Sequence, residues 1–257
     1  MSQTAIATNL QTVTPSTTTA KLQKPVTVVL VHGAWANASS WDKVISLLLA
    51  KGRRVIAVPL PLTSLEGDLA ATNRIVADTE GPIVLVGHSW GGMAVTQAGD
   101  APKVAALVYV SAFAPDVGES GGSLIGAHPT PPALSTIVTD SAGFVYQTVD
   151  GMLTNIAPDV PVADARVLAV TQGRLAGKAF EQTVAVAAWK TKPSWFIVTA
   201  DDRVVSPELQ AASAKRMQAK TTVIHSSHMS LLSHPGDVAS VIEDAVIRIQ
   251  SSAAMSS

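Results

Sequence analysis

The sequence predicts an α/β fold, in which a mostly parallel β-sheet carries helices on both faces. Short apolar runs rich in valine, leucine and isoleucine alternate along the chain with segments whose apolar residues recur at helical spacing. Continuous apolar strands are typical of parallel sheets, because helices cover both faces of such a sheet. The length of 257 residues and the 47% hydrophobic content are sufficient for one large domain with a sizeable core.

Strands and helices are expected to alternate regularly through the first 114 residues. The β-branched run 25–31 ends at His32-Gly33 and is followed by Ser39 and Asp42, which have the spacing of a helix capping box. The helix that begins there is expected to stop at Gly52. The later elements predicted in this half are strands at 54–58, 83–86 and 104–110 and helices at 68–78 and 89–98.

The regular alternation fails between residues 114 and 192, where prolines punctuate weakly helical segments at 162–171 and 179–189. This stretch is interpreted as an inserted helical cap. The α/β pattern then resumes with a strand at 195–199, a helix at 207–218, a short strand at 222–224 and a terminal helix that starts near Pro235.

These patterns divide the chain into an α/β core, a cap and two polar ends. The N-terminal stretch is rich in threonine and serine, and the C-terminal stretch is small and polar, so both are expected to be flexible. The predicted parts are a flexible arm at 1–24, a core at 25–114 and 191–250, a cap insertion at 115–190 and a flexible tail at 251–257.

Composition argues against several classes of partner and site. The 18 basic and 19 acidic residues nearly balance, which disfavours binding to nucleic acid or to an anionic membrane. No apolar stretch approaches the ~20 residues that span a bilayer, and no secretory signal is recognisable, so a cytoplasmic protein is expected. Cysteine is absent, which leaves only oxygen or nitrogen as a covalent nucleophile.

A serine nucleophile is indicated by the sequence Gly87-His88-Ser89-Trp90-Gly91, which fits the pattern G-x-S-x-G. The motif follows a predicted strand and precedes a predicted helix, and this context is the one that gives it meaning. A turn this tight forces the serine into a strained backbone conformation at the carboxyl edge of the sheet. Ser89 is therefore the predicted nucleophile.

A serine hydroxyl needs a general base, which is expected to be a histidine. His228 lies in the loop after the last predicted strand, where its side chain can reach back over the strand edge. His225 still belongs to that strand, and His234 adjoins a proline at a helix start, so both are weaker candidates. The pair His225 and His228 lacks a third ligand at convincing spacing, and no metal site is predicted.

An acid that orients the histidine is expected between the serine and the histidine in the chain. Asp201 and Asp202 both follow the predicted strand 195–199, and spacing alone does not choose between them. Asp116, just beyond the strand 104–110, is a weaker competitor.

Two backbone N–H groups are predicted to stabilise an oxyanion. One belongs to Trp90, the residue after the nucleophile, and the other to Ala34 in the loop after the first strand. Gly33 in the same loop would let the backbone come close to a substrate.

With these residues the chain resembles the α/β-hydrolase superfamily, and more closely its small branch of plant methyl esterases, hydroxynitrile lyases and bacterial carboxylesterases. The resemblance covers roughly residues 25–250. It is carried by the segments 29–35, 84–92, 202–210 and 227–229, followed by His234-Pro235. In this family the catalytic aspartate directly precedes an Arg-hydrophobic-hydrophobic segment, so the resemblance implies Asp202. It also implies a cap at the position of the insertion.

The resemblance further implies a reaction class. Dehalogenases and epoxide hydrolases of this fold carry aspartate where Ser89 stands, and the related plant hydroxynitrile lyases carry a lysine and a threonine where this chain has Met229 and Gly33. Hydrolysis of small or medium neutral carboxylic esters through an acyl-enzyme, without cofactor, is therefore expected. A cofactor-free perhydrolase, a hydroxynitrile-lyase-like or carbon–carbon bond enzyme, and a weakly catalytic small-ligand-binding protein remain as alternatives.

The pocket that would hold the ester is expected to be apolar. Large apolar residues are few in the insertion, and the candidates for lining the pocket are Phe144, Tyr146, Met152, Phe180 and Trp189. Of these, the residues chosen for the pocket are Phe144, Tyr146 and Trp189. Trp35 adjoins the predicted oxyanion donor Ala34 and is expected to shape the same pocket.

Overall fold

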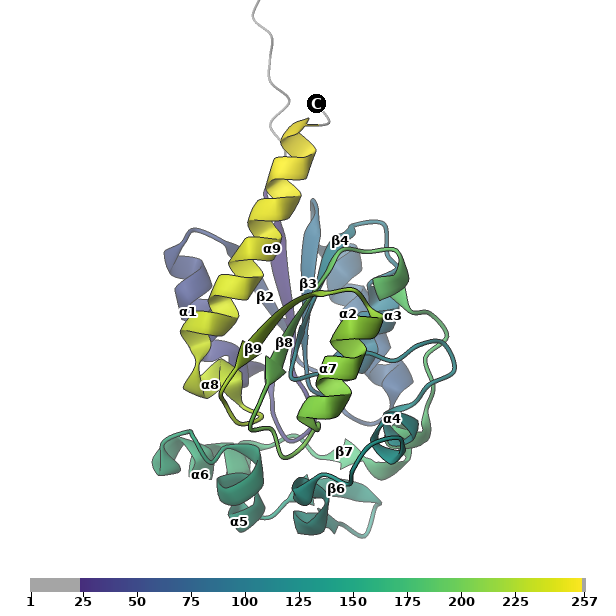
Figure 1. Ribbon diagram of the computed structural model, residues 1–257, viewed down its shortest axis with the longest axis vertical. Helices are drawn as coiled ribbons and strands as arrows, with labels where there is room; N and C mark the ends of the chain where they lie inside the picture. Colours follow the sequence, from purple (N-terminus) through teal and green to yellow (C-terminus); the bar gives the residue numbers. More distant parts are fainter. Residues whose placement is uncertain (1–23, 256–257) are drawn as a thin grey trace, which may run out of the picture.

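The computed structural model describes residues 24–255, and the predicted flexible arm lies almost entirely outside this range. Within it, six strands form a parallel sheet in the order β2-β1-β3-β4-β8-β9 (Figure 1). The chain adds β2 on one side of β1 and then β3 on the other side, and this reversal of strand order is typical of a doubly wound sheet. The strands are β1 (Thr27–Val31), β2 (Arg54–Val58), β3 (Ile83–His88), β4 (Val104–Val110), β8 (Ser194–Thr199) and β9 (Lys220–Ile224).

Helices cover both faces of this sheet, as the sequence predicts. One face carries α1 and α9, and the other carries α2, α3 and α7 (Figure 1). The helices of the core are α1 (Asp42–Ala50), α2 (Leu65–Asp78), α3 (Gly91–Ala98), α7 (Pro207–Arg216), α8 (Ser230–Ser233) and α9 (Pro235–Met255). The central strands β1, β3 and β4 are almost completely buried between these layers, whereas the edge strands β2 and β9 are partly exposed.

The ends of two helices differ from the sequence expectation. Helix α2 starts three residues early, because the Ser64 side chain caps it by accepting a hydrogen bond from the N–H of Gly67 at 3.0 Å. The predicted flexible tail is wrong for residues 251–255, which continue α9. The hydroxyls of Ser251 and Ser252 donate to carbonyl oxygens one turn back, so these small polar residues remain compatible with a helix.

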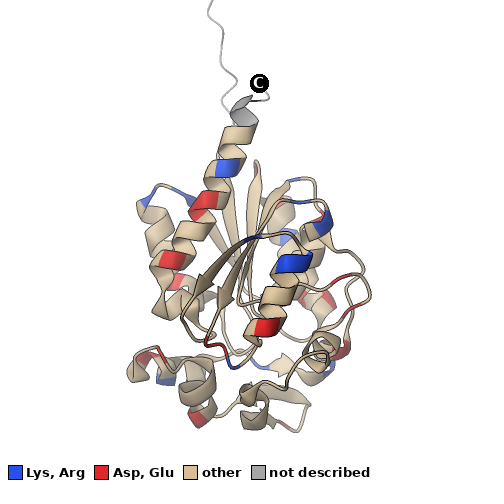
Figure 2. Cartoon of the chain, in the orientation of Figure 1, with Lys and Arg blue, Asp and Glu red and all other residues tan. Residues whose placement is uncertain are grey.

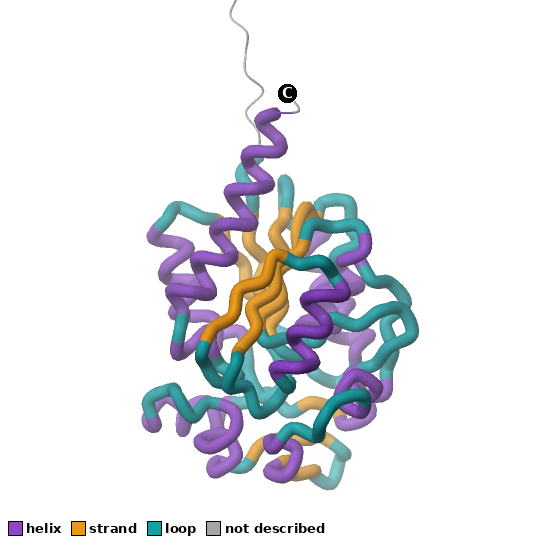
Figure 3. Tube along the Cα trace, viewed as in Figure 1, coloured by secondary structure: helices purple, strands orange, loops and turns teal. Residues whose placement is uncertain are grey.

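Residues 115–190, here called the insertion, lie between β4 and β8 below the carboxyl ends of the strands (Figure 1). The sequence leads to the expectation of a helical cap, but besides helices the insertion contains an antiparallel sheet of three strands in the order β5-β6-β7 within the described residues. Figure 3 shows this part of the molecule as loops with short helices and strands. Its elements are α4 (Gly121–Gly126), η2 (Pro132–Thr136), β5 (Ile137–Thr139), β6 (Phe144–Gln147), α5 (Val149–Gly151), η3 (Met152–Ile156), α6 (Val162–Thr171), β7 (Leu175–Ala176), η4 (Gly177–Glu181) and η5 (Ala188–Lys190).

The helix predicted at 179–189 is also absent from the described insertion. Only the short 3₁₀ turns η4 and η5 lie there, separated by an extended stretch. In that stretch Thr183 forms an isolated bridge with Ser120, and the N–H of Val184 donates to the carbonyl of Glu119. Backbone pairing with the start of α4 therefore takes the hydrogen bonds that a helix would use.

Two properties of the described residues bear on possible partners, namely the distribution of charge and the length and hydropathy of the helices. Basic and acidic residues are interspersed over the helices and loops (Figure 2). No helix between residues 24 and 255 is long and apolar enough to cross a membrane.

Candidate active site

The turn between β3 and α3 holds Ser89 in the conformation that the sequence motif predicts. The φ angle of Ser89 is +53°, a left-handed value that costs a residue other than glycine about 1–3 kcal/mol. The N–H of Ser89 donates to the carbonyl of Val110 in the neighbouring strand β4 at 3.1 Å, which fixes the turn against the sheet. A Cβ at Gly91 would lie 2.6 Å from two carbonyl oxygens of the β1 end, so only glycine allows this packing.

The loop after β1 comes close to this turn. A Cβ at Gly33 would lie 2.6 Å from the Ser89 Cβ, and this explains why a glycine precedes the predicted oxyanion donor Ala34. Ala34, Trp90 and Ser89 line one small cavity of about 10 Å³. Among the described residues, neither the Ala34 N–H nor the Trp90 N–H donates a hydrogen bond. Both predicted donors are therefore free to bind an oxygen atom next to Ser89.

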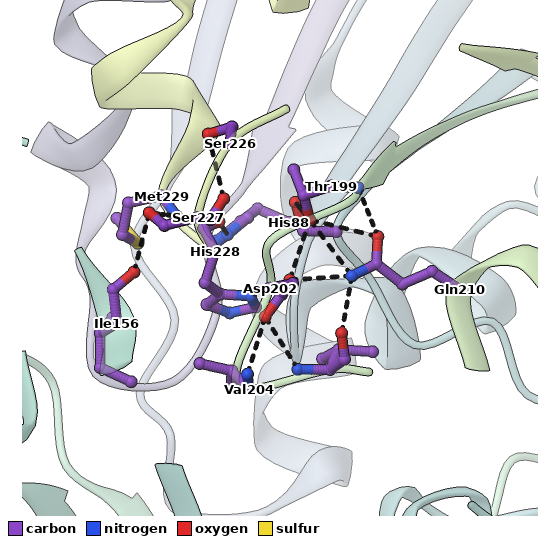
Figure 4. Close-up of polar contacts among 12 residues, drawn as sticks. His88, Ile156, Thr199, Asp202, Val204, Gln210, Ser226, Ser227, His228 and Met229 are labelled. Carbon is purple, nitrogen blue, oxygen red and sulfur yellow. Dashed lines mark hydrogen bonds and ion pairs between the residues drawn. The ribbon is translucent and has the colours of Figure 1, made fainter. Parts of the chain in front are cut away.

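The structure brings His228 and Asp202 together. His228 Nδ1 lies 2.8 Å from Asp202 Oδ2, and both side chains are buried (Figure 4). The carboxylate can only accept, so Nδ1 carries the hydrogen and Nε2 of His228 is left as the acceptor. This Nε2 is buried and has no hydrogen-bond partner among the described residues. It forms no hydrogen bond with the Ser89 hydroxyl here, and such contacts often tighten only when substrate binds.

Asp202 is held by several other donors, which the sequence does not reveal. Its Oδ1 accepts from the N–H groups of Val204 and Val205 at 2.7 and 3.1 Å. Its Oδ2 accepts from the Thr199 hydroxyl at 2.9 Å and from the Gln210 amide at 2.8 Å, in addition to His228. Figure 4 shows this network around the carboxylate. A carboxylate with this many donors is held in one orientation.

The competing candidates lie elsewhere. The side chains of Asp201 and His225 are 63% and 87% exposed, and their nearest charged atoms are 3.7 Å apart on the surface. Because His225 points to solvent while His228 is buried, the two histidines do not converge on a metal. Asp116 pairs with Lys190, whose ammonium lowers the pKa of that carboxyl. His234 Nδ1 lies 3.9 Å from Asp159 Oδ2.

His88, the variable residue of the motif, supports the loop that carries His228. Its Nε2 donates to the carbonyl oxygen of His228 at 2.9 Å, and the two rings pack at a centroid distance of 4.7 Å. Burial lowers the pKa of His88 well below that of an exposed histidine, and the adjacent His228 lowers this pKa further. Burial therefore favours the neutral form of His88.

A second support for the loop comes from the insertion. The carboxylate of Asp159 accepts hydrogen bonds from the Ser226 hydroxyl at 2.9 Å, the Ser227 N–H at 2.9 Å and the Ser227 hydroxyl. Burial opposes ionisation of Asp159, but these hydrogen bonds outweigh it and lower the pKa of the carboxyl. An isolated aspartate after a proline gives no sequence signal for such a contact, because the serine loop is 67 residues away.

The predicted pocket residues are only partly correct. Trp35 lines the cavity above Ser89, but Phe144, Tyr146 and Trp189 do not. Trp189 instead donates its indole N–H to the carbonyl of Pro115 at 2.8 Å, and Tyr146 packs under the Arg174 guanidinium. The remaining cavity walls are formed by Phe113, Ile125, Leu134, Phe180 and Val204.

The error has a simple origin in the strand β6. Side chains of a strand alternate between its faces, so Phe144 and Tyr146 lie on one face and Val145 on the other. Val145 lines an apolar groove next to the cavity. When the segment is interpreted as part of a helical cap, nothing indicates that Val145 lies on the opposite face from Phe144 and Tyr146.

Comparisons with known proteins agree with the fold. The chain matches the model of the alpha/beta hydrolase family over residues 28–241, and it belongs to that family. This confirms the fold class expected from the sequence and the superfamily that the sequence resembles.

Individual relatives are similar over parts of the chain. A carbendazim hydrolyzing esterase from Nocardioides sp. (strain SG-4G) is 34% identical over 106 residues, which are 36% of this chain and 44% of that protein. Methylesterase 2 of Arabidopsis thaliana is 30% identical over 161 residues, which are 53% of this chain and 61% of that protein. The chain thus spans between two fifths and about three fifths of the length of these relatives.

The structure is also similar to that of a pyrethroid hydrolase from Sphingobium faniae JZ-2. The TM-score is 0.73, and the match covers 87% of this chain and 98% of that one, at 21% sequence identity. At this identity the similarity supports the fold alone.

Proposed function

We propose that the protein is a serine esterase that hydrolyses carboxylic esters through an acyl-enzyme at Ser89. The observation that carries the proposal is the cavity in which the strained Ser89 lies beside two N–H groups without partners. A serine without a catalytic role would not explain why a strained backbone and two N–H groups without partners occur together beside it. The names of the two esterase relatives point to the same chemistry.

In the first half of the reaction the Ser89 Oγ attacks the carbonyl carbon of the ester, and its proton passes to His228 Nε2. The carbonyl oxygen becomes an oxyanion, which the N–H groups of Ala34 and Trp90 stabilise. His228 then gives the proton to the leaving alkoxide, so that an alcohol departs and an acyl group remains on Ser89. Asp202 keeps the imidazole in the required tautomer and stabilises its charged form.

In the second half a water molecule attacks the acyl carbon. His228 takes a proton from this water, the Ala34 and Trp90 N–H groups again hold the oxyanion, and the carboxylic acid leaves as the proton returns to Ser89. A buried, neutral Met229 follows His228. No ammonium group adjoins the base at this position, so water is the expected second reactant and cyanohydrin cleavage is disfavoured.

The test is active-site labelling followed by ester hydrolysis. A fluorophosphonate probe should label the full chain on Ser89 and should not label Ser89→Ala, and p-nitrophenyl acetate should be hydrolysed with a burst if deacylation is slow. Ser89→Ala should lose several orders of magnitude in rate, because only binding and oxyanion stabilisation remain.

The same experiment can contradict the proposal. A folded Ser89→Ala variant with near-normal hydrolysis would exclude the acyl-enzyme. Efficient turnover of a cyanohydrin or of a peracid reaction, with no cleavage of simple esters, would keep the fold and replace the reaction class. Addition of EDTA should leave the rate unchanged.

A further inference from the structure

The cavity above Ser89 is too small for an ester. Its volume of about 10 Å³ corresponds to roughly one water molecule, and even an acetyl group is larger. For a substrate to reach Ser89, part of the cavity wall has to move.

A larger apolar groove lies directly behind one wall of this cavity. The groove has a volume of about 270 Å³ and lies among α4, η2, β5, β6 and η4 of the insertion. Ile125, Leu134 and Phe180 line both the cavity and the groove, so these three side chains form the partition between them. The groove is lined further by Ile137, Val145 and two glycines, and none of its lining side chains is polar.

The two sides of the cavity differ in how firmly they are held. Trp90 is fully buried, and its indole N–H donates to the buried Asp68 carboxylate at 2.8 Å. Asp68 is itself held by the N–H of Leu62 at 2.8 Å. Phe180 packs edge-on against Trp90 at a centroid distance of 5.4 Å, but it is only partly buried and is carried by the single 3₁₀ turn η4. Phe180 is therefore held less firmly than Trp90.

We propose that the groove holds an extended apolar group of the ester, and that Phe180 is the gate between this groove and the cavity at Ser89. The inference rests on the proposed esterase function and adds a substrate class, namely esters with a long aliphatic or an aryl group. A polar or charged group would find no hydrogen-bond partner among the groove side chains, and its desolvation would be uncompensated. When Phe180 swings aside, the cavity and the groove become one continuous channel.

The test compares esters of increasing length in the full chain and in variants. In p-nitrophenyl acetate, butyrate and octanoate the acyl group varies, whereas in methyl and octyl acetate the alcohol varies. Wild-type kcat/KM should rise with length in at least one series, and that series identifies the part of the ester that enters the groove. Ile137→Asn, which changes a residue of the groove that is absent from the cavity, should lower kcat/KM for the long ester roughly tenfold and leave acetate within about twofold.

Two further variants separate a specific effect from a general one. Phe180→Ala should raise the ratio of kcat/KM for the long ester over that for acetate, because it removes the gate. Val170→Asn places the same polar side chain at a position of the insertion that is 78% exposed and does not line the groove, and it should leave this ratio unchanged. The rate of fluorophosphonate labelling checks that each variant has an intact Ser89 site.

The outcomes are distinguishable from failure of the proposed function. Serine-dependent hydrolysis of acetate together with length ratios that neither Ile137→Asn nor Phe180→Ala changes would overturn the groove and keep the esterase. A uniform loss for all esters in both variants would also overturn it, since that result indicates a structural role. Absence of any Ser89-dependent ester hydrolysis would overturn the esterase, and the groove proposal with it.

Discussion

Asp202 and Phe180 belong to the two parts of the candidate site, the strand ends and the insertion, and they are held in different ways. Hydrogen bonds from five donors fix the Asp202 carboxylate, and every donor comes from a strand end or the loop or helix that follows it. Phe180 is held by ring packing and by its backbone alone. The chemical groups thus have one geometry, whereas the wall that faces the substrate has room to change.

The same difference applies to how well each part tolerates substitution. The strand ends are part of a sheet whose packing tolerates little change, since a Cβ at Gly91 already collides with the β1 end. The groove in the insertion is lined by apolar side chains, which can be exchanged for one another without burying an unpaired polar group. Function on such a fold resides in the site and in its loops.

The largest expected effect is on Asp202 itself. Asp202→Asn should reduce kcat by on the order of 10³ to 10⁴, because an amide in that place no longer imposes the tautomer of His228 that leaves Nε2 as an acceptor. Steady-state hydrolysis of p-nitrophenyl acetate measures the effect. The neighbouring Asp201→Asn is the matched control, and it should stay within about twofold because that carboxylate lies on the surface. Equal losses in the two variants would contradict the assignment of the acid.

A smaller loss of activity is expected where the insertion contacts the loop that carries His228. Asp159→Ala should lower kcat roughly 10- to 100-fold while KM changes little, because the loop before His228 loses three hydrogen bonds and the imidazole is displaced. Asp159→Asn retains acceptor capacity and should restore part of the rate. Asp164→Asn is a control in the same insertion, since that carboxylate is exposed and forms only a surface pair with Lys43.

The alternative for Asp159 is a purely structural role. In that case the melting temperature of Asp159→Ala would fall while kcat of the folded protein and the rate of fluorophosphonate labelling stayed at wild-type values. This combination would show that the loop keeps its position without help from the insertion.

The sequence predicts the residues at the strand ends well and those of the insertion poorly, and the reasons are physical. Motifs such as the one around Ser89 specify a local backbone path, and a parallel sheet brings the loops after β1, β3, β8 and β9 to one edge. Chain order and this shared edge are therefore enough to predict that Ser89, His228 and one of two aspartates lie near one another. Spacing does not choose between Asp201 and Asp202; the family resemblance implies Asp202, and in the structure Asp202 faces the histidine. The supports from Thr199, Gln210 and Asp159 have no local pattern, because each depends on a long-range contact.

The insertion lacks any comparable constraint. Its strands β5, β6 and β7 are two to four residues long, which is too short for an alternating pattern to be distinguished from a helical one. Without a recognisable period the faces of β6 cannot be assigned, and Phe144 and Tyr146 are predicted for the pocket on size, whereas Val145 lines the groove. Size alone is then a poor guide to which residues line a cavity.

The buried histidines under the site should make the free energy of unfolding depend on pH. Burial lowers the pKa of both His32 and His88 in the folded state, so below the unfolded value of about 6.5 the unfolded chain binds protons that the folded chain does not. Stability should therefore be independent of these groups above about pH 7 and should fall as the pH decreases from there. Each histidine contributes a slope of up to about 1.4 kcal/mol per pH unit.

Denaturant unfolding between pH 7.5 and 5.5 measures this slope. His88→Gln retains an N–H donor for the His228 carbonyl but does not titrate, and it should give a shallower decrease than the wild type. An identical slope in both proteins would mean that His88 is protonated in the folded state as readily as in the unfolded one.

The smallest effect is expected at the two aromatic residues that the sequence wrongly assigns to the pocket. Phe144 and Tyr146 lie on the face of β6 opposite Val145, and neither lines the cavity or the groove. Phe144→Ala and Tyr146→Ala should therefore leave kcat/KM within about twofold for both p-nitrophenyl acetate and octanoate. Tyr146→Ala should still lower the free energy of unfolding by about 0.5–1 kcal/mol, because the Arg174 guanidinium lies 4.1 Å above the ring centroid and loses this contact. Phe180→Ala, the same kind of truncation on the wall of the cavity, should change the ratio between the two esters. A change of that ratio in Tyr146→Ala or Phe144→Ala would instead show that β6 turns its other face to the substrate.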